Sequence, residues 1–183
     1  MKIKILLISI LFISITSCAQ GTKKEIKKDV TKMEAFTSKK GVIIKYIDFS
    51  LPDLPLTYGV AKTKIRKLIS GNEVQLFYQI SKKSKYGTKT ASIAYEDLQE
   101  ILKSLKTLEA EAINDKAINP DYLENKFITD DGLSLGYYVS DKKIGWYLVL
   151  EKYGSDNTIF IKDPLILKTA FNTAKKKIEE LKK

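Results

Sequence analysis

The chain contains no histidine and only one cysteine, Cys18. Without histidine it lacks the usual general base near neutral pH, the Ser-His and Cys-His nucleophiles and the ordinary zinc site. With one cysteine it cannot form an internal disulfide, so the fold must be stabilised by its core. The nine glycines are scattered, so no glycine-rich phosphate loop is present. These absences weigh against most enzymatic chemistry.

Carboxylate chemistry remains open, because a glycosidase needs only two Asp or Glu side chains at a suitable separation. Four aspartates could be nominated, but no spacing selects a pair among them: Asp48, Asp53, Asp130 and Asp131. A Ser-Lys dyad is equally unselected. The acidic turns at 130–132 and 154–157 lack the spaced carboxylates of a calcium loop. We therefore expect no catalytic residue, no metal site and no cofactor.

The N-terminus has the layout of an export signal. Lys2 and Lys4 precede an apolar stretch at 5–15, which is too short for a spanning helix of about 20 residues. The following residues, Ile15-Thr16-Ser17-Cys18, resemble the lipobox of bacterial lipoproteins, with Ile15 where leucine is usual. The resemblance implies a signal peptide at 1–17, diacylation of the Cys18 sulfur and acylation of the new N-terminus. The alternatives are an ordinary signal with a chance cysteine, or an uncleaved anchor.

The same signal predicts where the protein resides. We expect a lipid-anchored protein of the cell envelope. Ala19 follows Cys18 in place of the aspartate that retains some Gram-negative lipoproteins in the inner membrane, which favours the outer membrane. The chain carries a net charge of +10, but no basic stripe with interleaved aromatic residues appears, so we expect no nucleic-acid partner.

Residues 18–40 are predicted to be a flexible, lysine-rich tether between the lipid and the domain. Residues 19–40 hold seven lysines, three acidic residues and few large apolar groups. Such a segment cannot bury enough surface to offset its ordering entropy. Its lysines are interpreted as a solvated spacer, or alternatively as an attraction for anionic headgroups.

Residues 41–183 alternate between strand and helix patterns. Four strand-like runs precede apolar residues at helical spacing, and after Asn119-Pro120 the same order repeats. The strands are predicted at 42–49, 62–69, 73–81, 88–94, 124–129, 133–140, 143–151 and 157–162, and the helices at 98–113 and 164–181. The pattern predicts an α+β domain of antiparallel sheet with two amphipathic helices, in two tandem ββββα halves at 41–116 and 121–183.

The two halves also share short segments. Residues 85–88 (Lys-Tyr-Gly-Thr) parallel 152–155 (Lys-Tyr-Gly-Ser), and Asp97 parallels Asp163 at the helix starts. We interpret this as an internal duplication in which the first half carries an insert, Ser50 to Ala61. The alternative is convergence, because turns and caps draw on few residue types.

The hairpin around Asp141-Lys142 predicts which side chains face the core. Pairing Ser140 with Lys143 places one wholly apolar face inward. The opposite face then receives Tyr138 and Tyr147, and a two-residue turn at Asp131-Gly132 places Phe127 there too, beside Gly136. All three aromatic residues then lie over glycines. This face is either a binding platform, or a set of rings that covers glycine or lies under another element.

The favoured function is therefore a non-catalytic binding or interaction module that contacts an envelope protein or glycan. The alternative is a periplasmic carrier of a small ligand or lipid, with residues 51–56 as a lid. A carboxylate-dependent hydrolase is the third candidate. Each predicts a different shape: an aromatic face, a closed apolar cavity, or a cleft with two convergent carboxylates.

Overall fold

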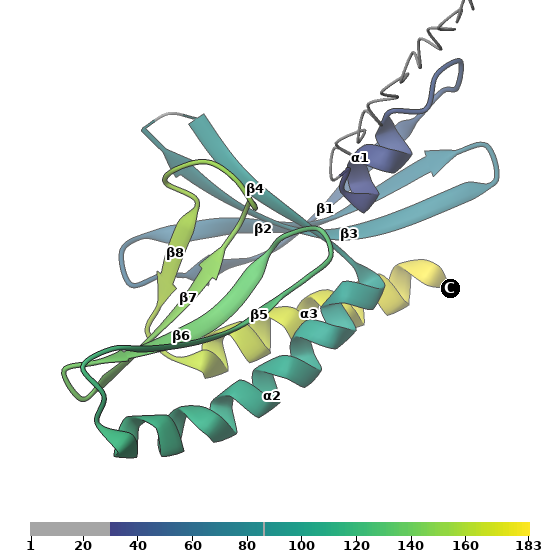
Figure 1. The fold of residues 1–183 in the computed structure, drawn as a ribbon. Coiled ribbons are helices and arrows are strands. Elements are labelled where there is room, and N and C mark those ends of the chain that lie inside the picture. Colours follow the sequence, from purple (N-terminus) through teal and green to yellow (C-terminus); the bar gives the residue numbers. More distant parts are fainter. Residues whose placement is uncertain (1–29, 86) are drawn as a thin grey trace, which may run out of the picture.

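The computed structural model describes residues 30–85 and 87–183. Two antiparallel four-stranded sheets each follow the order of the chain, and each leads into a long helix (Figure 1). This confirms the predicted α+β fold with tandem ββββα halves. The elements are α1 (Lys32–Thr37), β1 (Lys45–Pro55), β2 (Val60–Ser70), β3 (Glu73–Ser84), β4 (Gly87–Ala94), α2 (Tyr95–Ile118), β5 (Leu123–Ile128), β6 (Ser134–Ser140), β7 (Lys143–Val149), β8 (Thr158–Ile161) and α3 (Pro164–Lys182).

Each sheet contains a central hairpin closed by a two-residue turn. Ser70 pairs with Glu73 across the first turn, and Ser140 pairs with Lys143 across the second. In the second turn Asp141 and Lys142 both adopt left-handed φ angles of 49° and 60°. Such turns match the right-handed twist of the flanking strands, so they fix the hairpin register even without glycine.

The two helices are exchanged between the halves. Helix α2 follows the first sheet but packs chiefly against β5 and β6 of the second sheet. Helix α3 follows the second sheet but packs chiefly against β1, β2 and β3 of the first sheet. The helices also pack against each other, so one apolar core joins both sheets, from Ile65 and Tyr78 to Leu135 and Trp146. The halves therefore form a single folding unit.

The matched segments of the two halves are similar in part. Gly87 and Gly154 both adopt positive φ angles, 119° and 106°, although Gly87 is the first residue of β4 whereas Gly154 lies in the loop between β7 and β8. The helix starts differ, because Asp163 is the N-cap of α3 whereas Asp97 lies in the first turn of α2, after the N-cap Ala94. The strand order agrees with a duplication, but the two aspartates do not occupy equivalent helix positions.

The segment interpreted as an insert, Ser50 to Ala61, is largely sheet. Strand β1 continues to Pro55 and pairs with β2, with a register shift between Leu51 and Leu54. Leu54 and Leu56 are buried in the core, which holds this segment in place. Residues 51–55 are therefore part of the sheet, and the lid at 51–56 stays a prediction. The strand continues because its prolines lie on an edge strand, where a missing N–H is tolerated.

The predicted tether at 18–40 is too long at its C-terminal end. Residues 18–29 lie outside the described residues, but α1 is a regular helical turn that packs on the domain. Thr31 and Glu34 form a reciprocal capping box at its start. Phe36 is buried with Leu68 and Phe77 on the face of the first sheet opposite α2 and α3. The many lysines predicted a flexible segment, although the segment also contains Phe36, which is buried, and the capping residues Thr31 and Glu34.

We expect Phe36→Ala to lower the free energy of unfolding by about 3 kcal/mol, because it removes a buried aromatic ring from a small cluster. Val30→Ala is the control, since Val30 is 52% exposed and its truncation should cost about 0.5 kcal/mol or less. Chemical denaturation of both variants measures the difference. Equal stabilities would show that α1 does not contribute to the fold.

Candidate functional site

The outer face of the second sheet carries the aromatic residues singled out in the sequence. The observed pairs of β6 with β7 match the prediction residue by residue: Tyr138 lies opposite Gly145, Gly136 opposite Tyr147, and Tyr137 opposite Trp146. Tyr137 and Trp146 are buried in the core. Because successive side chains alternate between the faces of a sheet, Tyr138 and Tyr147 lie on the outer face, as predicted.

Phe127 lies on the inner face, contrary to the prediction. It pairs with Leu135 rather than Gly136, and it packs against the core. The cause is the loop after β5, in which the Gly132 N–H donates to Thr129 O at 2.9 Å and Gly132 adopts a φ of 87°. This three-residue loop shifts the register by one residue relative to a two-residue turn, and one residue exchanges the two faces.

Tyr147 supports the outer face but is not exposed on it. Its side chain is buried, and its hydroxyl donates a hydrogen bond to Glu124 Oε1 at 2.5 Å. Burial, together with this carboxylate, raises the pKa of the Tyr147 hydroxyl well above its usual value. The ring lies over Gly136, where an added Cβ would approach the Tyr147 hydroxyl to 2.9 Å. Tyr147 is therefore a fixed part of the sheet surface.

Tyr138 lies at the centre of the exposed aromatic residues. Its ring stacks on Tyr122 with centroids 6.4 Å apart and planes at 17°, and it meets Phe160 edge-on, also at 6.4 Å. These separations are typical of favourable aromatic pairs. Tyr122 is 63% exposed and Phe160 is 45% exposed, whereas Tyr138 is half-buried. We call these three rings the aromatic surface.

Glycine beneath Tyr138 lets its ring lie close against the sheet. A Cβ added at Gly145 would lie 2.3 Å from the Tyr138 ring, so the ring rests directly on the backbone of β7. In the described part of the chain no helix packs on this face, because α2 and α3 contact the inner faces and α1 contacts the first sheet. The aromatic surface is thus open within the described structure.

Two of its three members were missed in the sequence. Phe160 lies opposite Tyr147 in β8, so extending the predicted register by one strand would have found it. Tyr122 directly precedes β5, and continuing the observed β5–β6 register by one residue places it opposite Ser140, diagonal to Tyr138 on the same face. It was missed because the predicted register of β5 was off by one residue, which assigns Tyr122 to the inner face.

The nominated carboxylates do not converge on a catalytic cleft. Asp48 accepts hydrogen bonds from Arg66 at 2.7 Å and from Lys64 at 2.7 Å, and mainly the Arg66 bond holds the Asp48 pKa well below its usual value. Asp53 is paired with Lys62 at 2.7 Å. Over residues 30–85 and 87–183, no group of three or more potential metal ligands occurs. These charges are engaged in ion pairs along the first sheet.

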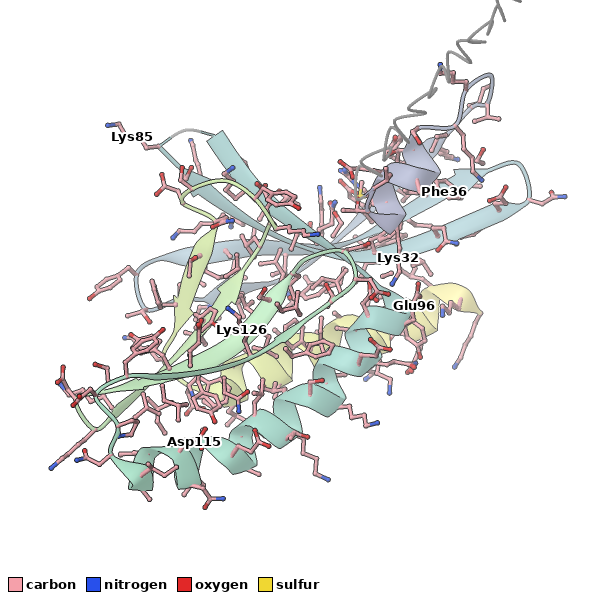
Figure 2. The ribbon with its side chains drawn as sticks, in the orientation of Figure 1. Lys32, Phe36, Lys85, Glu96, Asp115 and Lys126 are labelled. Atoms are coloured by element: carbon pink, nitrogen blue, oxygen red, sulfur yellow. The ribbon has the colours of Figure 1, made fainter. Side chains whose placement is uncertain are left out.

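Asp131 belongs to a different arrangement, at the junction of α1, α2 and the β5–β6 loop. The Lys32 ammonium donates to Asp97 and lies 3.8 Å from Glu96, while the Lys32 backbone N–H donates to Asp131 at 3.0 Å (Figure 2). Burial opposes the charge on Lys32, but the Asp97 hydrogen bond and the charges of the nearby carboxylates together outweigh it and raise the Lys32 pKa. Burial, aided by the charge of Asp97, raises the Asp131 pKa. The cluster fastens α1 to both halves.

Substitution of the two glycines tests how this face is built. Gly145→Ala should displace only the mobile end of Tyr138 and cost about 1 kcal/mol or less. Gly136→Ala should cost more, about 1–3 kcal/mol, because an added Cβ would lie 2.5 Å from the backbone oxygen of Asn125. Denaturant titration of the two variants provides the comparison. A Gly145→Ala variant that is as unstable as Gly136→Ala would show that the Tyr138 ring is held rigidly from above.

Cys18 lies outside the described residues, so the structure does not place the lipidation site. No helix in the described part of the chain is long and apolar enough to cross a membrane. Comparison of the chain with protein-family models, curated proteins and solved structures finds no match.

Proposed function

We propose that the protein is a lipid-anchored, non-catalytic binding module of the cell envelope, and that the aromatic surface is its contact site. The observation that carries the proposal is the set of three adjoining rings left uncovered by every described helix. Contiguous exposed apolar groups on a folded domain mark interaction sites more often than isolated ones do. The lipobox-like sequence at 15–18 supports the location.

The surroundings of the rings favour a protein partner. The outer face combines the aromatic surface with small and polar residues of β6 and β7: Ser134, Gly136, Ser140 and Gly145. Tyrosine with serine and glycine is the composition of protein-binding paratopes, in which rigid rings supply area and hydroxyls supply hydrogen bonds. Tyr147 and Glu124 brace the sheet beneath, which limits the ordering cost of binding.

The position of the aromatic surface suits an anchored protein. The described chain begins next to α1, which packs on the first sheet, whereas the β6–β7 turn lies at the opposite end of the molecule (Figure 1). A lipid at Cys18 would be joined to the described domain at Val30, next to α1. The second sheet would then lie away from the anchor, where a partner can reach it.

A non-catalytic role is supported by the side chains available. The chain has no histidine, and the aspartates nominated for catalysis are engaged elsewhere or lie apart from the aromatic surface. On the outer face of the second sheet, Glu124 already accepts a hydrogen bond from the Tyr147 hydroxyl. The charged and hydroxyl groups of this face therefore suit recognition better than proton transfer.

Site-specific photocrosslinking in intact cells tests the proposal. A benzophenone amino acid in place of Tyr122 should give a defined protein adduct, and the same probe at Ile113 should not. Ile113 is the matched control, because it is 72% exposed on α2. Adding Tyr138→Ala to the Tyr122 probe should weaken capture by about tenfold or more, since central aromatic residues dominate interfaces.

Two outcomes would count against a protein partner at the aromatic surface. Equal adducts from positions 122 and 113 would contradict a specific contact at the aromatic surface. An adduct that disappears on glycan digestion but resists protease would replace the protein partner by a glycan. Circular dichroism of Tyr138→Ala must match the parent protein, so that loss of capture reports binding rather than unfolding.

A further inference from the structure

A concave site lies beside the first sheet, and none of its lining residues belongs to the aromatic surface. A cavity of about 450 Å³ opens between the end of β1 and the first turns of α3. Its walls are mostly apolar and come from these two elements: Leu51, Pro52, Pro55, Leu165, Ile166 and Ala170. The volume lies in the range of small-molecule sites, roughly 300–1,000 Å³.

The bulge in β1 explains why the cavity exists. Leu51 pairs with Thr63 and Leu54 pairs with Ala61, so two residues of β1 face one residue of β2. Such a bulge bends its strand away from the regular sheet surface. The Thr63 hydroxyl donates to Pro52 O at 2.7 Å and holds the bulge in this shape. The opening is therefore built into the sheet.

The cavity walls are anchored on both sides. Leu54 and Leu56 are buried in the core directly beside the bulge. The Thr57 N–H donates to Phe160 O at 2.8 Å, which ties the β1–β2 hairpin to β8. Leu165 remains 60% exposed at the rim of the cavity. A preformed apolar cavity with an exposed leucine at its mouth can accept a ligand without a large rearrangement.

Every charged group that borders the cavity already has a partner. Asp53 is bound by Lys62 at 2.7 Å, and Asp163 accepts the Leu165 N–H at 2.8 Å as the N-cap of α3. The Thr169 and Thr173 hydroxyls donate to carbonyls of their own helix at 2.8 Å. Among the described residues that line the cavity there is no lysine or arginine to receive a carboxylate or phosphate. The ligand chemistry that fits is therefore neutral.

Tyr78 supplies one polar contact at the base of the cavity. Its ring is buried, and burial raises the pKa of its hydroxyl well above its usual value. Tyr78 and Thr63 both line the cavity, and the Thr63 hydroxyl proton is already donated to Pro52 O. The oxygen of the Tyr78 hydroxyl can therefore accept from an incoming hydroxyl or amide N–H.

We propose that this cavity binds a neutral, predominantly apolar small molecule with one hydroxyl or amide group, such as a long-chain alcohol or a neutral acyl lipid. The site is independent of the aromatic surface, because its residues come from β1, β2, β3 and α3. A neutral head is held by Tyr78, and the chain lies between the bulge of β1 and α3.

Ligand binding is tested on residues 19–183, which include all of the described core. N-phenyl-1-naphthylamine, a neutral fluorophore, should bind at one site per chain. 1-Decanol should displace the fluorophore about tenfold more effectively than decanoate of equal chain length. The reason is that no described lysine or arginine lines the cavity to pair with the carboxylate. Equal displacement by the two compounds would overturn the assignment to a neutral ligand.

Two tryptophan variants on α3 locate the site. Thr173→Trp fills the rim of the cavity and should abolish fluorophore binding. Asn172→Trp is the matched control, since residue 172 is exposed and does not line the cavity. A folded Thr173→Trp variant that binds as tightly as the control would overturn the proposal.

A second measurement does not depend on the folding of the Thr173→Trp variant. In the unmodified chain, nuclear Overhauser contacts should join 1-decanol to the methyl groups of Leu165 and Ile166. Contacts to other methyl groups alone would place the ligand elsewhere and overturn the proposal. Tyr78→Phe should weaken 1-decanol binding several-fold, because it removes the Tyr78 hydroxyl that accepts from the ligand.

Discussion

The packing of each long helix against the other half's sheet is the constraint on which the rest of this fold depends. An antiparallel sheet of four strands with one apolar face is not stable until that face is covered. Here α2 covers mainly β5 and β6, and α3 covers mainly β1 to β3. Because the two helices also contact each other, neither sheet has a complete core of its own. Many small exported domains are stabilised by disulfides, whereas this fold is stabilised by its shared core.

The outer faces of the two sheets differ in how they are covered. Both long helices are used on the inner faces, so each outer face needs cover of its own or stays open. On the first sheet, α1 provides that cover by burying Phe36 against Leu68 and Phe77. On the second sheet, no described helix does so, and aromatic rings lie over glycine instead. The same ββββα plan thus yields one face covered by α1 and one face without a described helix, which we propose as the binding surface.

Local sequence features predicted local structure well. The two-residue turn at Asp141-Lys142 fixed the β6–β7 register, and with it the inward side of Trp146 and the outward side of Tyr138. Where the loop length was misjudged, the face was reversed, as Phe127 illustrates. The capping box at Thr31 and Glu34 was visible in the sequence, but the surrounding lysines favoured a flexible segment.

Long-range features could not be obtained in this way. Nothing in the periodicity of α2 or α3 states which sheet each helix will cover, because an apolar stripe fits either one. The cavity beside the β1 bulge likewise depends on how separate elements meet. For the candidate binding surface, the sequence predicted the sheet and the central residue Tyr138. Tyr122 and Phe160 were identified only in the structure.

Native-state hydrogen exchange of the intact chain measures whether the exchanged helices make one cooperative unit. The slowest amides of β2 and β3 in the first sheet should converge, as denaturant is added, on the same opening free energy as those of β6 and β7 in the second. That result is expected because unfolding either half removes the helix that covers the other. Separate opening free energies, with one sheet exchanging while the other stays protected, would contradict the shared core.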